Sequence, residues 1–392
     1  MTAATLVLNG GSSSLKFAVF EERGELRLLA RGSVSSICRQ PRLHVAPTAL
    51  SPEVDRSLGD GSIDIATAFE AVAGFLADRD LLRRIAKVGH RIVHGGNEFA
   101  RATRLDERTL DALRKLEPLA PIHQAINLEI VGLAGRLLPE AIQVGCFDTA
   151  FHQARPELAK IYGLPHAMSE QGIVSYGFHG LSFSHIAAKL RDRYGDAVGG
   201  RAIVAHLGSG ASLCAMKTGA SQATTMGFST LDGLVMSTRC GAIDPGVLLH
   251  LLRDRKLSSD QLTDLLYERS GLLGVSGISG DMQTLLASTD SAATRAVDLF
   301  IYRVGREIGS LAAAIGGLDT LVFTAGIGEH APMIRKRICE AAAWLGVAVD
   351  AGLNRNDAVL VSAPNSRVDV LVIPADEERA VATELLNWKP PI

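Results

Sequence analysis

The sequence predicts an α/β fold of two similar halves with a cleft between them. First, short apolar runs alternate with helical patterns along the 392 residues. Second, a strand, a Gly/Ser-rich turn and a second strand open the chain at residues 6–20, and the same arrangement recurs at residues 203–216. Third, the apolar run 320–324 also leads into a glycine turn. The repeated opening suggests a duplicated domain.

Length and composition are typical of a two-domain soluble protein. The chain exceeds the usual size of one core, with 47% hydrophobic and 21% charged residues. A net charge of −2 gives no broad field to attract nucleic acid or a membrane. Five scattered cysteines without a C-x-x-C pair argue against a disulfide framework. With no bilayer-length apolar run and no basic N-terminal flank, we expect a cytoplasmic protein.

The elements of the first half follow from local patterns. Residues 38–62 are rich in Pro, Ser, Gly and charge, which predicts a loop or small excursion. The helical spacing of Phe69, Val72, Ala73 and Leu76 predicts a helix that Ser62 caps. Residues 87–96 then read as a strand that enters a glycine turn.

Two further elements complete this half, and one more helix is marked in the second. Apolar residues spaced through 130–138 predict an amphipathic helix. Residues 142–147 form a strand that ends at Asp148. In the second half, Pro332 lies in the expected first turn of the helix after the 325–329 turn.

Three glycine turns, each directly after an apolar strand, favour nucleotide binding. The first is residues 9–14, where Ser12, Ser14 and Lys16 add donors and charge to backbone amides. It is not a Walker A loop, and taken alone it favours an ordinary hairpin. The other two, residues 208–210 and 326–328, make a set suited to the phosphates and adenosine of a nucleotide.

Two arginines lie beside glycine turns. Arg91 ends a strand next to His90 and His94, and Arg239 precedes Cys240 and a glycine. A guanidinium matches the oxygens of a transferring phosphoryl group. A surface ion pair is the commoner role of a single arginine, and composition does not decide between the two.

Three further positions have a structural and a functional interpretation. Asp148 follows a buried strand, where α/β proteins place functional carboxylates, but it could equally cap a helix. His179, among glycines and aromatics, suits either a site or a core position. The acids at 376–378 could bind magnesium or simply favour the start of a helix.

The motifs together resemble the acetate kinase family over nearly the whole chain. The matching stretches are LVLNGGSSSLK, GHRIVHGGNEF, LAPIH, FDTAFH, YGFHG, HLGSG, MGFSTLDGLVM, STRCG, FTAGIGE and the final EE. Their order separates this family from hexokinases and actins. The resemblance implies two duplicated actin-like (ribonuclease H-like) domains around a cleft, usually in a homodimer. We expect an N-terminal domain at 1–148, a nucleotide-binding domain at 149–374, and a C-terminal helix at 375–392 that returns to the first.

The resemblance also implies roles for individual residues. Asp148, His179, Arg239 and Arg91 would be catalytic, with His179 as transition-state stabiliser. Magnesium, or manganese, would bind Asn9 and Glu377. The carboxylate substrate would meet Arg91, Val93, Ile122, Phe178 and Thr230. ATP or ADP would meet Ser12, Lys16, His206, Gly208, Ser209, Gly210, Asp281, Met282, Gln283, Gly326, Ile327, Gly328, Glu329 and His330.

The chain departs from the family pattern at several positions. Ser209 replaces an asparagine near the phosphates, and Thr230 replaces a proline near the acyl pocket. Phe183 replaces a histidine, Ala242 replaces an acid, and Gln124-Ala125 replaces Asn-Pro. Ser209 therefore bears on phosphate affinity, and Thr230 on the choice among acetate, propionate and longer acids.

The predicted reaction is a reversible, magnesium-dependent phosphoryl transfer between ATP and acetate, giving acetyl phosphate. A carboxylate is already ionised at neutral pH, so it needs no general base. Asp148 is then an orienting group, and transfer is direct and in line. The alternatives are a kinase for propionate or another short acid, an actin-like ATPase, and a nucleotide-binding homologue without catalysis.

Overall fold

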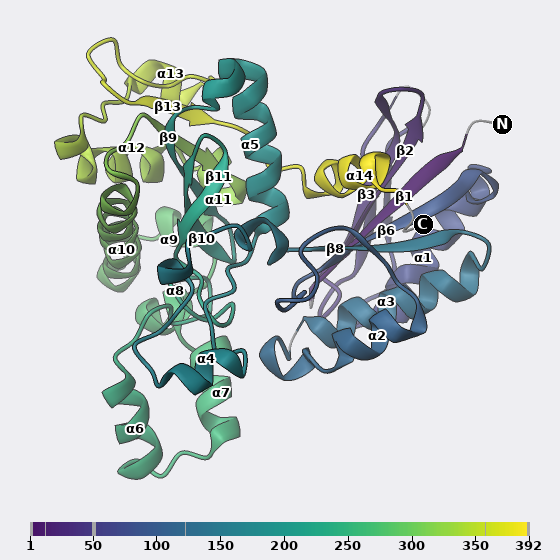
Figure 1. Cartoon of the computed structure of the whole chain (residues 1–392), viewed down its shortest axis with the longest axis horizontal. Coiled ribbons are helices and arrows are strands. Elements are labelled where there is room, and N and C mark those ends of the chain that lie inside the picture. The colour runs from purple at the N-terminus through teal and green to yellow at the C-terminus, as the bar shows by residue number, and fades with distance from the viewer. Residues whose placement is uncertain (1–2, 12, 49–51, 122, 357, 390–392) are drawn as a thin grey trace. The chain divides into compact units, whose positions relative to one another are not determined.

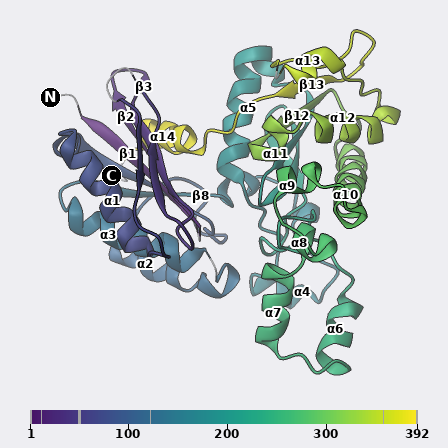
Figure 2. The same cartoon turned by 180° about the vertical axis from the view of Figure 1, so that it is seen from behind.

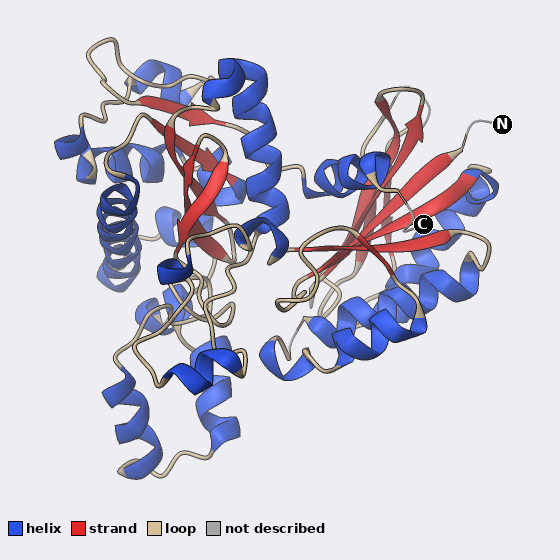
Figure 3. Cartoon of the chain, in the orientation of Figure 1, coloured by secondary structure: helices blue, strands red, loops and turns tan. Residues whose placement is uncertain are grey.

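The structure is a computed structural model that describes residues 3–11, 13–48, 52–121, 123–356 and 358–389. The chain divides into two compact units, Met1–Phe151 with Asp376–Ile392 and His152–Ala375. Each unit contains one sheet and a set of helices, as Figure 3 shows in red and blue. Among the described helices, none combines the length and apolarity that crossing a membrane requires.

The first unit contains an eight-stranded sheet in the order β5-β4-β3-β2-β1-β6-β8-β7. Its strands are β1 (Ala4–Gly10), β2 (Leu15–Glu22), β3 (Leu26–Ser35), β4 (Arg42–Val45), β5 (Val54–Ser57), β6 (Ile85–Ile92), β7 (Thr103–Arg104) and β8 (Ile142–Phe147). The strands β1, β2 and β3 form an antiparallel meander, whereas β6 and β8 continue the sheet parallel to β1. The carboxyl ends of β1, β6 and β8 therefore lie at one edge.

Helices cover both faces of this sheet. They are α1 (Ile65–Asp78), α2 (Glu107–Arg114), α3 (Gln124–Leu137) and the C-terminal α14 (Glu377–Asn387). Apolar side chains of α1 and α3 pack with those of β1, β2 and β3 in one core. The helix α14 packs on the other face, against β1, β2 and β6, as Figures 1 and 2 show. Gly89 of β6 allows this approach, since a Cβ there would lie 2.6 Å from Val381 of α14.

The second unit contains a five-stranded sheet in the order β11-β10-β9-β12-β13. Its strands are β9 (Arg201–Leu207), β10 (Ala211–Lys217), β11 (Ala220–Thr224), β12 (Thr320–Thr324) and β13 (Asp369–Val372). Its helices are α4 (His166–Glu170), α5 (Gly180–Tyr194), α6 (Pro245–Arg253), α7 (Ser259–Glu268), α8 (Gly271–Ser276), α9 (Met282–Ala287), α10 (Ser291–Ile315), α11 (Ala325–His330), α12 (Pro332–Ala341) and α13 (Ala351–Arg355). Figure 1 draws α5 and α10 on opposite sides of the sheet.

The two sheets share one topology. In the first, β3-β2-β1 are antiparallel and β6 and β8 follow in parallel; in the second, β11-β10-β9 are antiparallel and β12 and β13 follow in parallel. The opening hairpins also correspond, with Gly10 paired to Leu15 and Leu207 paired to Ala211. The duplication that the repeated motifs suggested is thus confirmed at the level of strand order.

Two local predictions were wrong. Residues 38–62 are not a loop throughout, because β4 and β5 lie within them and extend the sheet edge. Leu43 and Val45 of β4 alternate with polar neighbours, which is the pattern of a strand with one buried face. Helix α1 is capped by Asp64 rather than Ser62, since the Asp64 carboxylate accepts a 2.8 Å hydrogen bond from the Thr67 amide.

Candidate active site

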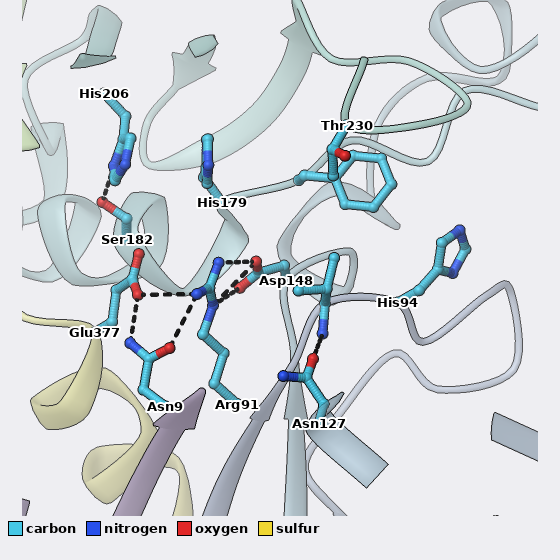
Figure 4. A network of polar contacts seen from close by, with 12 residues as sticks. Asn9, Arg91, His94, Asn127, Asp148, His179, Ser182, His206, Thr230 and Glu377 are labelled. Atoms are coloured by element: carbon cyan, nitrogen blue, oxygen red, sulfur yellow. Dashed lines mark hydrogen bonds and ion pairs between the residues drawn. The ribbon is translucent and has the colours of Figure 1, made fainter. Parts of the chain in front are cut away.

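In the first unit, polar side chains gather at the carboxyl edge of β1, β6 and β8 (Figure 4). Asn9 ends β1, Arg91 lies near the end of β6, and Asp148 follows β8. Asn9 and Asp148 are 4% and 1% exposed. Parallel strands deliver their last residues to one edge, so sheet order brings together residues that are far apart in sequence.

Arg91 is the centre of this cluster. Its Nη2 donates to Asp148 Oδ2 at 2.7 Å and its Nε donates to Asp148 Oδ1 at 3.1 Å, which is a bidentate pair. Its Nη1 donates to Asn9 Oδ1 at 2.9 Å and lies 3.7 Å from Glu377 Oε2. Burial disfavours the charge of Arg91, but the Asp148 and Glu377 carboxylates outweigh it and raise the pKa of Arg91. Burial raises the pKa of Asp148, and Arg91 opposes that shift.

The first turn of α14 completes the cluster with carboxylates. Asn9 Nδ2 donates to Glu377 Oε2 at 2.8 Å and to Glu378 Oε1 at 3.1 Å. Asp376 caps the helix by accepting from the Arg379 amide, and it pairs with Arg31 of β3. Both contacts fix the start of α14, so Glu377 and Glu378 are held against β1.

The helix α3 fixes the turns beside this cluster. Asn127 Nδ2 donates to the Gly10 carbonyl at 2.9 Å, and its Oδ1 accepts from the Val93 amide at 3.0 Å. One buried amide side chain therefore connects the end of β1 to the turn after β6. Gln124 acts similarly on His94, accepting from its amide at 3.2 Å and donating to its carbonyl at 3.0 Å.

In the second unit, two histidines are stacked beside the β9–β10 hairpin. The rings of His179 and His206 have centroids 4.2 Å apart and an interplanar angle of 20°. A 2.8 Å hydrogen bond joins His179 Nδ1 and the Ser212 hydroxyl, and another joins His206 Nδ1 and the Ser182 hydroxyl. His179 has a left-handed backbone, with φ of 58°, at the start of α5. Serine contacts thus fix both ring planes.

Two predicted site residues of this unit, Arg239 and His179, lie close to Gly210. A Cβ at Gly210 would lie 3.0 Å from Arg239 Nη2 and 3.3 Å from His179 Nε2. Arg239 Nη1 donates to the Thr230 carbonyl at 2.7 Å, which aims the guanidinium. The Ser237 amide donates to the Ser209 carbonyl at 3.1 Å and holds the two loops together. The turn therefore presents backbone, a guanidinium and an imidazole side by side.

The helix α11 lies next to the same hairpin. Positions 208 and 325 approach closely, because a Cβ at Gly208 would lie 3.7 Å from Ala325 Cβ. Arg335, fully buried, donates to the carbonyls of Gly328 at 3.0 Å and Glu329 at 2.6 Å and to Asn354 Oδ1 at 2.8 Å. The guanidinium of Arg335 therefore holds the short helix α11 in place through two of its carbonyls.

Comparison with known proteins identifies the chain. The model of the Acetokinase family matches residues 4–383. The chain is 48% identical to an acetate kinase of Rhodopseudomonas palustris (strain TIE-1), with 99% of this chain and 98% of that protein covered. It is 45% identical to an acetate kinase of Nitrobacter hamburgensis, with 97% and 95% covered. The chain belongs to the acetokinase family.

Solved structures agree with this family. A propionate kinase of Francisella tularensis superposes with a TM-score of 0.89 at 34% identity, covering 97% of this chain and 98% of that one. An acetate kinase of Porphyromonas gingivalis gives a TM-score of 0.85 at 34% identity, covering 98% and 99%. The predicted α/β fold of two actin-like domains is confirmed.

The acetokinase chain brings most of the predicted residues of each unit together. The first unit gathers Asn9, Arg91, Asp148 and Glu377, with the buried Val93 next to Asn127. Lys16 is exposed on β2. Ser12 and Ile122 lie outside the described residues.

The second unit places its predicted residues in two connected groups. His179, His206, Arg239 and Thr230 surround the 208–210 turn, and residues 326–330 form α11 beside it. Asp281 caps α9, and Gly280 lies against the Ser237 carbonyl. Met282 is buried at 4% exposure, whereas Gln283 is exposed.

The departures from the family pattern have distinct environments. Phe183, in place of a histidine, is fully buried and meets the rings of His152 and His206 edge-on. Ser209 and Ala242 are exposed, so neither replacement disturbs a core. Thr230 is buried at 7% exposure, and Phe178 is fully buried.

Sequence reasoning gave no role to Asn127 or Arg335, and it named Glu378 only among the acids at 376–378. Glu378 differs from Glu377 by one position, and only the geometry shows that both reach Asn9. An asparagine and an arginine at apolar helical positions, such as Asn127 and Arg335, were the available signal, because buried polar side chains need specific partners.

Proposed function

We propose that this chain is an acetate kinase that transfers a phosphoryl group between ATP and acetate, giving acetyl phosphate and ADP. The observation that carries the proposal is the convergence of Arg239 and His179 on Gly210, within a chain of the acetokinase family. A guanidinium and an imidazole beside a glycine turn suit the negative charge that develops on a transferring phosphoryl group.

Arg91 suits the carboxylate side of this reaction. The acceptor is an anion at neutral pH, so it needs a fixed cation rather than a base. Asp148 orients Arg91 through the bidentate pair and leaves Nη1 toward Asn9 and Glu377. Asp148 does not need to accept a proton in this reaction, because the attacking oxygen carries none.

The donor set in the first unit fits magnesium. Asn9, Glu377, Glu378 and Asp148 offer hard oxygens around a single guanidinium, which leaves a formal surplus of negative charge. Among the described residues, no cluster of three or more His, Cys, Asp or Glu side chains forms a metal cage. Magnesium commonly binds through one or two carboxylates and keeps several waters, so Asn9 and Glu377 suffice as its protein contacts. Bound there, the ion would offset the repulsion between phosphate and carboxylate.

Trapping of acetyl phosphate with hydroxylamine tests the activity. ATP, magnesium and acetate should yield acetyl hydroxamate, and Arg239→Ala should lower turnover by roughly 10³-fold, the scale of an arginine finger. Arg295→Ala, exposed on α10, is the matched control and should keep full turnover. A loss below tenfold in Arg239→Ala would contradict the assigned role.

The stereochemical course tests direct transfer. A chiral phosphoryl donor should give inversion at phosphorus, because one in-line displacement inverts the centre. Retention would require a phosphoenzyme. ATP hydrolysis without any carboxylate, and without acetyl phosphate formation, would instead favour an actin-like ATPase.

A propionate kinase is the second candidate, favoured by the Francisella tularensis neighbour and by Thr230. Thr230 places a hydroxyl and a methyl in a buried position next to the carbonyl that orients Arg239. Values of kcat/KM for acetate, propionate and butyrate measure this preference, because one methylene changes selectivity by roughly 1–3 kcal/mol. Thr230→Pro should shift the preference toward acetate; a strict acetate preference in the unaltered protein would exclude the second candidate.

Magnesium binding is tested with Glu377→Gln. Loss of one carboxylate should raise the magnesium concentration for half-maximal activity by about tenfold, with Glu340→Gln on the exposed face of α12 as control. An unchanged magnesium requirement would remove Glu377 from the site.

Oligomeric state and location complete the proposal. The exposed apolar side chains of α6, Val247 at 42%, Leu249 at 58% and Leu252 at 40%, suit a homodimer interface. Leu249→Glu should then give a monomer in light scattering, and a monomeric unaltered protein would exclude this interface. None of the five cysteines, all of which the structure describes, forms a disulfide, which suits action in the cytoplasm.

A further inference from the structure

A cavity lies in the first unit, apart from the residues of the candidate active site. Its volume is about 930 Å³, within the range of small-molecule sites. One wall consists of residues 100–104, which include β7, with the start of α2, and the other is the last turns of α14. Its position at the sheet edge follows from β7, which is the outermost strand beside β8.

The cavity carries exposed positive charge. Arg101, Arg104 and Lys389 line it, and all three are exposed. Two acids also line it, Asp106 and Glu384. The formal balance is three positive against two negative charges, so the state of the two acids decides how strongly the cavity attracts an anion.

Both acids of the cavity have other partners, and Asp106 also lies near Arg104. Asp106 caps α2, accepting a 2.9 Å hydrogen bond from the Thr109 amide. Burial raises the pKa of Glu384, whose carboxyl hydrogen-bonds the buried Cys146 thiol of β8. With both acids counted as charged, the lining still has one more positive than negative group.

An aromatic ring borders the same space. Trp388 follows the last turn of α14 and is half-buried at the cavity. Ala100 and Ala102 add small apolar surface to the same lining. A ring face beside guanidinium groups suits a ligand with a planar apolar part and an anionic group.

Two elements connect this cavity to the active-site cluster of the same unit. Glu384 and Glu377 lie on α14, seven residues or about 10 Å apart along the helix axis. Cys146, the partner of Glu384, is on β8 two residues before Asp148. A ligand that shifts α14 or the edge of β8 therefore moves groups that hold Asn9 and Arg91.

We propose that this cavity is an effector site for a small anion with a planar ring, such as an aryl phosphate or aryl carboxylate, and that its occupancy alters the kinase reaction through α14. The binding part does not rest on the proposed function, because it is measured without turnover.

Intrinsic fluorescence tests binding. The chain has two tryptophans, so Trp344→Phe, which removes the exposed one, leaves Trp388 as the reporter. Phenyl phosphate should quench Trp388 saturably, and inorganic phosphate, which lacks the ring, should bind at least tenfold more weakly. Double substitution Arg101→Ala/Arg104→Ala in the same background should weaken phenyl phosphate binding at least tenfold. Arg108→Ala, exposed on α2 outside the cavity, should bind as the parent does.

A second titration separates this cavity from the active site. The fluorescence response should persist unchanged in Arg239→Ala. Saturating phenyl phosphate should also change, by at least twofold, the magnesium or ATP concentration for half-maximal activity, and the double variant should lose that effect. No saturable quenching, quenching retained in the double variant at unchanged circular dichroism, or binding without any kinetic change would each overturn the proposal.

Discussion

At the scale of single residues, the Arg91–Asp148 pair sets the character of the first unit's cluster. Taking both charges out of water is costly, and the bidentate geometry with Asn9 as a further partner offsets that cost. Asp148 caps no α-helix and instead binds the guanidinium of Arg91. Its contacts therefore favour a functional carboxylate over a helix cap. The pair orients Arg91 more than it adds stability.

Asp148→Asn should therefore impair turnover far more than folding. Asparagine keeps the shape but removes the charge and one acceptor, so we expect a loss of about 1–3 kcal/mol in the free energy of unfolding. Misplacement of Arg91 should lower kcat/KM by about 10²-fold or more. Urea unfolding and the hydroxamate assay measure the two effects.

The matched control for this substitution is Asp64→Ala. Asp64 caps α1 and is remote from the cluster in sequence, so its loss should cost about 1 kcal/mol of stability and leave turnover intact. If Asp148→Asn behaved like this control, Asp148 would be a structural residue.

At the scale of elements, the short helix α11 depends on contacts from the helix that follows it. The helix α11 has six residues, too few to be stable alone, and it carries the predicted nucleotide-binding residues 326–330. Arg335 of α12 compensates by donating to two of its carbonyls and to Asn354. A buried side chain on the next helix therefore holds α11 in place.

Arg335→Lys should loosen the helix α11. Lysine keeps the charge but cannot reach α11 and Asn354 at once, so buried carbonyls lose donors and stability should fall by about 1–3 kcal/mol. Since α11 is predicted to contact nucleotide rather than acetate, the KM for ATP should rise at least fivefold while the KM for acetate stays constant. Steady-state kinetics with each substrate varied in turn measures this. Equal increases in both constants would argue for a general loss of structure instead.

At the scale of the whole molecule, buried histidines make the protein sensitive to acid. Burial lowers the pKa of His90 and His94 to about 4 and of His152 to about 3. The His152 ring hydrogen-bonds the Ser221 hydroxyl and the Phe178 carbonyl, both at 2.9 Å, and burial outweighs the carbonyl, which by itself would raise the pKa. Protonation of any of these rings is therefore easier in the unfolded chain.

Stability should fall as pH decreases below about 6.5. Below that pH the unfolded chain binds protons that the folded protein does not, so each such histidine removes about 1.4 kcal/mol per pH unit down to its folded pKa. Asp148 and Glu384, whose pKa values burial raises, act in the opposite direction and reduce the net slope.

Urea midpoints at pH 7.5, 6.5 and 5.5 measure this dependence. His152→Gln should flatten the slope by about one histidine's share, and His166→Gln, on the exposed α4, should leave it unchanged. Identical slopes in the protein and in His152→Gln would contradict a neutral, buried His152.

The sequence by itself determined the class of fold, the duplication, most elements and the family. These follow from short-range rules, namely apolar periodicity, glycine turns and motif order, which act within a few residues. It failed where local signals were ambiguous. β4 extends the edge that β3 offers and β5 the edge that β4 offers, and Asp64 rather than Ser62 caps α1.

Only the tertiary structure decided which polar groups meet. Asn9 and Glu377 are 368 residues apart and share a hydrogen bond, and Arg91 is 57 residues from the carboxylate that orients it. Such pairs depend on the order of strands in the sheet and on the return of α14, which no local pattern encodes. The same is true of the cavity beside β7, whose lining comes from residues 100–109 and from residues 383–389.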